Sequence, residues 1–233
     1  MRLTSIGSAA ALAAMLIAPA SAGIIPYASR TAFDAQGTVT SIDWSVFGPF
    51  GTTISTPDFR TVGSVTVGVA SSQGELSRHD EGTDFSGDFA PGDHLLTDAG
   101  SESDSFIISF GAPVRGFGAQ VEPDYLTGDW SGTVTLYDAS STVIGTFAIL
   151  GTRGTAEDNS APFFGFISSV ADISFATFVV DQSAISLPPA GAVAVNTMDV
   201  LGVVPESSSL SMAAAGLLGL AGMFLLRRRA ITS

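Results

Sequence analysis

The sequence predicts an all-β fold, an antiparallel β-sandwich of the jelly-roll type, flanked by two apolar chain ends. Apolar and polar residues alternate with a period of two in many short segments, as in Val65, Val67 and Val69. Segments rich in Gly, Asp and Ser separate these runs. Between the two ends no segment has a capped helical period. Many short strands without intervening helices are typical of a sandwich.

The first 22 residues have the three parts of a secretory signal. Arg2 supplies a positive charge, residues 6–18 form an apolar stretch rich in alanine, and the small residues Ala20 and Ala22 precede the expected cleavage point. We therefore expect a signal helix over 1–22. The secretion machinery would export the chain and a signal peptidase would remove this segment.

Residues 23–203 are expected to form one β-sandwich ectodomain. This length suffices to bury a core without disulfides, which the chain cannot form because it has no cysteine. The turn residues 138–141 lie between two alternating runs and predict a hairpin. The other expected strands include residues 38–47, 105–110, 114–121, 143–150, 162–167 and 192–200.

The charge of this region excludes one class of partner. Residues 23–204 hold five arginines against 21 acidic residues, which gives a formal charge of −16. Nucleic-acid binding needs clustered Lys and Arg to neutralise phosphates. We therefore expect no nucleic-acid partner.

The C-terminus has three parts of its own. Val204, Pro205 and Glu206 precede an uncharged apolar run over 210–226, and Arg227, Arg228 and Arg229 follow it. A helix over this run would be roughly 25 Å long, close to the ~30 Å of a bilayer's hydrocarbon core. The arginines would stop transfer on the cytoplasmic side. This pattern predicts a transmembrane helix with the main domain outside the inner membrane.

This tail resembles the PEP-CTERM sorting signal over residues 204–229, with the motif at 204–207, although Ser207 stands where the family usually has a second proline. The resemblance implies processing by an exosortase-like enzyme of a Gram-negative bacterium that makes extracellular polysaccharide. It also implies an inner-membrane precursor that later reaches the cell surface or extracellular matrix. A plain membrane anchor with the same topology is the alternative.

The stretch 82–200 also resembles a recurring ectodomain of PEP-CTERM proteins, which is similar in outline to carbohydrate-binding jelly rolls. The residues that carry this resemblance are 89–93, 107–114, 116–120, 135–139 and 158–165.

Two groups of residues are weighed as metal ligands. The acidic segment, residues 75–104, holds nine carboxylates but lacks the spacing of a calcium loop, so a solvated, mobile loop is the favoured interpretation. Asp158, Asn159 and Asp199 form a second candidate for structural calcium, by analogy with jelly rolls. His79 and His94 are too few for a histidine zinc site, and no other cofactor is expected.

Four aromatic residues are candidates for stacking on sugars. Tyr125 and Trp130 flank an expected loop at 126–129 and are the best binding candidates of the four, although packing against the rim of the sandwich is the favoured interpretation even for this pair. Trp44 and Tyr137 fall in expected strands and are assigned to the core.

The sequence contains no recognisable catalytic motif, and we name no catalytic residue. The preferred hypothesis is a non-enzymatic surface or matrix protein, sorted by its PEP-CTERM tail and associated with extracellular polysaccharide. One alternative is a carbohydrate-binding module proper. The other is a secreted hydrolase, in which carboxylates such as Glu122 and Asp124 would face part of the acidic segment.

Overall fold

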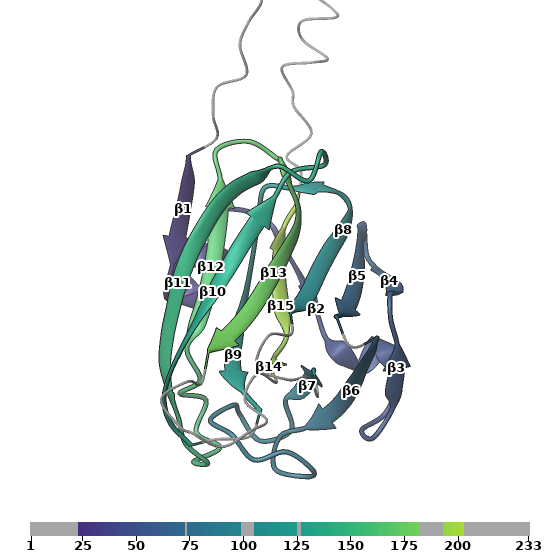
Figure 1. Cartoon of the computed structure of the whole chain (residues 1–233), viewed down its shortest axis with the longest axis vertical. Coiled ribbons are helices and arrows are strands. Elements are labelled where there is room, and N and C mark those ends of the chain that lie inside the picture. The colour runs from purple at the N-terminus through teal and green to yellow at the C-terminus, as the bar shows by residue number, and fades with distance from the viewer. Residues whose placement is uncertain (1–22, 73, 99–104, 125–126, 182–192, 203–233) are drawn as a thin grey trace, which may run out of the picture.

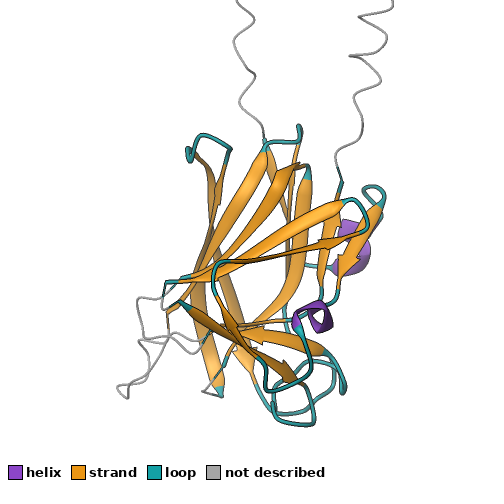
Figure 2. Ribbon diagram, turned by 90° about the vertical axis from the view of Figure 1, so that its right-hand side faces the viewer, coloured by secondary structure: helices purple, strands orange, loops and turns teal. Residues whose placement is uncertain are grey.

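The computed structural model describes residues 23–72, 74–98, 105–124, 127–181 and 193–202. Within these residues the strands form two antiparallel sheets that face each other as a β-sandwich (Figures 1 and 2). The all-β class and the sandwich expected from the sequence are confirmed. The start of β1 (Ile24–Tyr27) and the end of β15 (Met198–Leu201) lie at one end of the sandwich (Figure 1). We call the opposite end, which carries the connections 81–93 and 154–162, the loop end.

The first sheet has six strands within the described residues. Their order is β11 (Val143–Arg153), β10 (Gly128–Tyr137), β13 (Ile173–Asp181), β8 (Phe106–Val114), β5 (Val65–Ser71) and β4 (Asp58–Val62).

The second sheet has nine strands within the same ranges. Its main path is β1 (Ile24–Tyr27), β12 (Phe163–Ser168), β9 (Gly116–Pro123), β14 (Val193–Val195), β7 (His94–Thr97), β6 (Glu75–Asp80) and β3 (Thr53–Ser55). In addition, β15 (Met198–Leu201) pairs with β9 and with β2 (Val39–Ile42).

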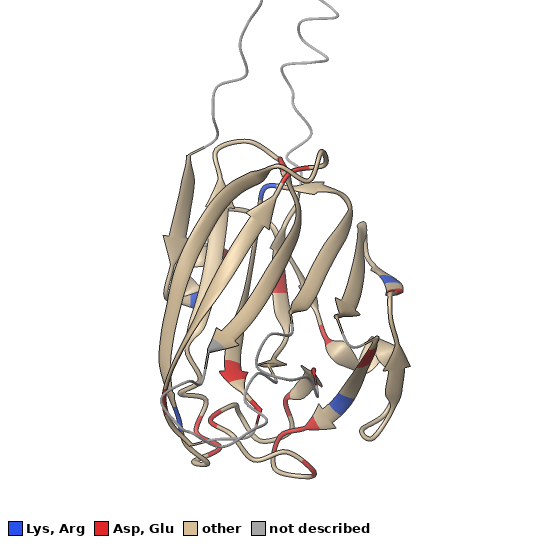
Figure 3. Ribbon diagram, in the orientation of Figure 1, with Lys and Arg blue, Asp and Glu red and all other residues tan. Residues whose placement is uncertain are grey.

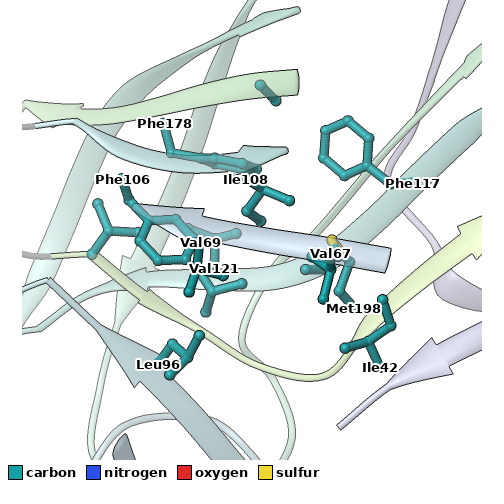
Figure 4. Packing of buried hydrophobic residues seen from close by; sticks show 14 of the residues in the cluster. Ile42, Val67, Val69, Leu96, Phe106, Ile108, Phe117, Val121, Phe178 and Met198 are labelled. Atoms are coloured by element: carbon teal, nitrogen blue, oxygen red, sulfur yellow. The ribbon is translucent and has the colours of Figure 1, made fainter. Parts of the chain in front are cut away.

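The core lies between the sheets and consists of the side chains that point inward from the strands of both sheets (Figure 4). Val67 of β5, Ile108 of β8, Phe117 of β9 and Met198 of β15 are fully buried there. The Phe117 ring contacts Phe110, Phe166 and Phe178, with ring centroids 5.5 to 6.2 Å apart. Burying one large apolar side chain contributes about 1.5–3 kcal/mol, so this core is the main source of stability.

One expected strand is only partly a strand. Residues 38–47 form β2 and then a 3-10 helix, η1 (Trp44–Phe47), which begins where the Asp43 carboxylate accepts the Ser45 N–H at 2.7 Å. A five-residue helix, α1 (Arg30–Asp34), also occurs where the sequence shows no helical period. Ser29 is the N-terminal capping residue of this helix, and its hydroxyl oxygen accepts the Ala32 N–H. Side-chain capping of this kind stabilises short helices that pattern alone does not predict.

The expected signal helix (1–22) and sorting tail (204–229) lie outside the described residues. Among the residues that are described, no helix is both long and apolar enough to cross a membrane.

Candidate functional site

Three carboxylates from separate segments converge at the loop end. Glu81 follows β6, Asp88 lies in the connection to β7, and Glu122 lies near the end of β9; none is more than 6% exposed. Gly87 lies between two of them, because a Cβ at this position would be 2.6 Å from Glu122 Oε2 and 3.3 Å from Glu81 Oε2. Only glycine leaves room for this convergence.

Backbone N–H groups hold these carboxylates in place. Glu81 Oε1 accepts the Gly87 N–H at 2.7 Å, and Glu122 Oε2 accepts the Asp88 N–H at 3.2 Å. The two oxygens of Asp88 accept the N–H groups of Gly154 and Ala156 at 2.5 and 3.0 Å. Asp88 therefore ties the connection 154–162 to the connection 81–93, and Glu122 ties the connection 81–93 to β9.

Arg153 is the cation of this cluster. Its Nε lies 3.8 Å from Glu122 Oε2, its Nη2 donates to the Ser86 carbonyl at 2.8 Å, and its guanidinium lies over the Phe85 ring. One guanidinium does not balance three carboxylates. Burial raises the pKa of Glu122 to about 8 and also raises the pKa of Glu81. Glu122 is therefore mostly protonated at neutral pH.

The acidic segment is thus not a solvated loop over the part described. It forms β6, β7 and a folded connection between them, and Glu81 and Asp88 are buried. The expectation of a solvated, mobile loop is wrong for these residues. The backbone N–H group of Gly87 for Glu81, and those of Gly154 and Ala156 for Asp88, make their burial tolerable.

The hydrolase alternative expected Glu122 and Asp124 to face this segment. Glu122 lies close to Glu81 and Asp88 as that alternative requires. Asp124 is half-buried, and burial raises its pKa. A hydrolytic carboxyl group must reach its substrate. The three convergent carboxyl groups are at most 6% exposed in this structure.

The three expected calcium ligands have separate partners. The Asp158 carboxylate accepts the Ser160 N–H, Asn159 Oδ1 accepts from Gln120 Nε2, and Asp199 receives the Arg30 guanidinium at 2.7 Å. The Asp199 carboxylate also accepts the Ser41 hydroxyl at 2.6 Å and is almost fully buried. Across the described ranges, no three His, Cys, Asp or Glu side chains are arranged to hold a metal ion.

Of the preferred sugar-stacking pair, Tyr125 lies outside the described residues. Trp130 is only 5% exposed and packs edge-on against Phe164, with ring centroids 6.0 Å apart. On β10 Trp130 faces inward with Val134 and Leu136, so it packs in the core and is not exposed as the sugar-stacking interpretation requires. Trp44 is in the core as expected, although it comes from η1 rather than from a strand.

Tyr137 lies on the outer face of the six-stranded sheet, not in the core. It is the register partner of Phe175 on β13, and the two rings stack at 4.3 Å with an interplanar angle of 7°. Its orientation was readable from the sequence, because it follows the inward Leu136. The orientation of Phe175 was not, since an irregularity in β13 reverses the face between Ile173 and Phe175.

The outer face also carries Phe59, which the sequence analysis did not select. Phe59 of β4 is 56% exposed and its ring covers Gly68 of β5. The charged residues of β11, β10, β13 and β8 are Asp129, Arg153 and Asp181, and each lies within two residues of a strand end; the rest of these strands is uncharged (Figure 3). This uncharged face with aromatic rings, on a chain of formal charge −13, is the candidate binding surface.

No family model and no curated protein matches the sequence. Among solved structures, a DUF4465 family protein from Bacteroides caccae aligns with 13% identity and a TM-score of 0.39, covering 70% of this chain and 99% of its own. A family 6 carbohydrate-binding module from Clostridium stercorarium, in complex with cellobiose, aligns with 15% identity and a TM-score of 0.32, covering 65% and 94%. A family 11 carbohydrate-binding module from Clostridium thermocellum aligns with 8% identity and a TM-score of 0.28, covering 66% and 96%. Similarity at this level carries no functional conclusion.

Proposed function

We propose that this protein is a non-enzymatic, exported β-sandwich protein that associates with extracellular polysaccharide through the outer face of its six-stranded sheet. The observation that carries the proposal is the composition of that face, which combines aromatic rings with Ser and Thr hydroxyl groups. Aromatic rings pack against the apolar faces of sugar rings, and hydroxyl groups exchange hydrogen bonds with sugar hydroxyl groups. A mostly apolar surface with a few polar groups is typical of small-molecule and sugar sites.

The proposal includes display outside the cell. The sequence predicts a secretory signal and a PEP-CTERM-like tail, so the partners would be signal peptidase, the inner membrane and an exosortase-like enzyme. The tail would follow β15, which ends opposite the loop end of the sandwich (Figure 1). An anchored precursor would then stand on this end, with its sheet face open to the side.

The test is polysaccharide binding by the purified full-length chain in detergent. Affinity electrophoresis would compare its mobility in gels that contain the producing cells' exopolysaccharide, hydroxyethyl cellulose, glucomannan, laminarin or alginate. Retardation by at least one of them is expected, and a non-binding protein of similar size and charge corrects for gel viscosity. Unchanged mobility in every gel would refute polysaccharide association.

A hydrolase is the second candidate because Glu81, Asp88 and Glu122 converge. Since these groups are buried, we expect no release of reducing ends from the same polysaccharides. Release that Glu122→Gln abolishes would favour the hydrolase.

A further inference from the structure

The outer face of the six-stranded sheet contains one row of register partners that crosses every strand. Tyr137 pairs with Val143 and Phe175, Phe175 with Ser109, Ser109 with Gly68, and Gly68 with Phe59. We call these six residues the cross-strand row: Val143, Tyr137, Phe175, Ser109, Gly68 and Phe59. Partners in register project from the same face of a sheet, so the row is continuous.

The aromatic residues of this row lie toward its two ends. The stacked pair of Tyr137 and Phe175 lies on β10 and β13, and Phe59 lies three strands away on β4. Neighbouring strands are about 4.8 Å apart, so about 14 Å of sheet separates Phe175 from Phe59. The residues between them are Ser109 and Gly68, and the Phe59 ring lies over Gly68.

Phe59 is fixed in place although it is exposed. A Cβ on Gly68 would lie 2.4 Å from Phe59 Cε1 and 2.5 Å from Ser109 Oγ, so the ring lies against the backbone of β5. The opposite side of the ring faces solvent, since 56% of the residue is exposed. A ring that is already held on a rigid strand loses little conformational entropy when a ligand packs on it.

Threonine hydroxyl groups flank the row, and the register partners on either side of it are uncharged. On one side the adjacent register positions are Thr146, Thr135, Thr177, Ile107 and Ala70. On the other side Thr61 and Thr66 share a hydrogen bond at 2.9 Å. The charged neighbours of Phe59 on β4, Asp58 and Arg60, alternate toward the opposite face and pair with each other at 2.5 Å.

We propose that the cross-strand row binds one uncharged polysaccharide chain that lies across the strands. Phe59 and the Tyr137–Phe175 pair would hold sugar rings, and the flanking threonines would bond their hydroxyl groups. This inference rests on the proposed function and names its ligand class. The row has no cation to pair with a uronic acid or a sulfate, and the acidic domain repels anionic chains. A neutral chain needs no cation as a partner and is not repelled by the acidic domain.

The test measures binding of the full-length protein to hydroxyethyl cellulose, glucomannan and laminarin, with alginate as the anionic probe. Phe59→Ala is expected to weaken binding of the neutral ligand about tenfold, as loss of an aromatic anchor commonly does. Phe50→Ala is the matched control, because Phe50 is 54% exposed but lies outside the sheets. Leu150→Ala is the second control, because Leu150 is 68% exposed on the same face but in another row. Both controls should bind as wild type does.

Two further variants separate stacking from folding. Tyr137→Ala should weaken binding while Tyr137→Phe, which keeps the ring, should retain most of it. Thermal unfolding of each variant shows whether the fold is intact.

The outcomes distinguish the two proposals. If the wild type binds a polysaccharide and Phe59→Ala binds equally well, the cross-strand row is refuted and polysaccharide association stands. Binding of alginate alone would overturn the neutral ligand class. If no polysaccharide binds, both proposals fail.

Discussion

The raised pKa of Glu122 predicts how the free energy of unfolding changes with pH. Burial raises the pKa of this carboxyl group to about 8 from its ordinary value of 4.5. The folded state therefore binds more protons than the unfolded state between these values, and stability falls as pH rises through this window. Below pH 4.5 the carboxyl group is neutral in both states, and above pH 8 it is ionised in both. The groups that face it are Glu81, Asp88 and Arg153.

The magnitude follows from the size of the shift. One pKa unit corresponds to about 1.4 kcal/mol, so ionising Glu122 in the folded state costs on the order of 5 kcal/mol over the whole window. Glu122→Gln keeps the shape of the side chain but cannot ionise. At pH 5 the variant should match the wild type, and at pH 9 it should melt on the order of 10 °C higher. Its free energy of unfolding should depend less steeply on pH.

The assay is thermal unfolding at pH 5, 6, 7, 8 and 9, followed by tryptophan fluorescence. Glu75→Gln is a suitable control, because Glu75 is exposed on β6 and also loses one carboxylate. Parallel curves for the wild type and Glu122→Gln across this range would refute the argument that burial holds Glu122 in its neutral form.

Three further predictions concern the core, the outer face and the tail. Trp130→Ala should lower the free energy of unfolding by about 3–5 kcal/mol, measured by denaturant titration, because the side chain fills the core; a loss below 1 kcal/mol would contradict its burial. Gly68→Ala should weaken neutral-polysaccharide binding, measured by affinity electrophoresis, because the new methyl group displaces the Phe59 ring; unchanged affinity would show that the ring's position is unimportant. Pro205→Ala combined with Glu206→Ala should leave a membrane-bound precursor in cells that carry an exosortase, whereas Ser207→Pro should be processed. Intact mass and membrane fractionation check the tail, and identical full-length product with and without the enzyme would identify a simple anchor.

Some features of the fold and the site follow from local sequence. The alternation of Val65, Val67 and Val69 predicts β5 because side chains on a strand alternate between faces. The same rule places Trp130 on the inward face with Val134 and Leu136 and places Tyr137 on the outward face. The loop expected at 126–129 obscured the inward orientation of Trp130, and the strand position of Tyr137 was assigned to the core although Tyr137 faces outward.

Other features depend on which strands become neighbours. Glu122 lies on β9, which is buried along its whole length, so no alternation marks its environment. The convergence of Glu81, Asp88 and Arg153 around it requires contacts between three distant parts of the chain.

The sequence alone determined the all-β class, the acidic character and the expectation of a signal and a sorting tail. The tertiary structure decided the cross-strand row, because it joins Phe59 to Phe175 through pairings that no local pattern encodes. An irregularity in β13 also reversed the face of Phe175 against its even spacing from Ile173. Strand periodicity is a property of a few adjacent residues, whereas strand order and register are set by burying a shared core.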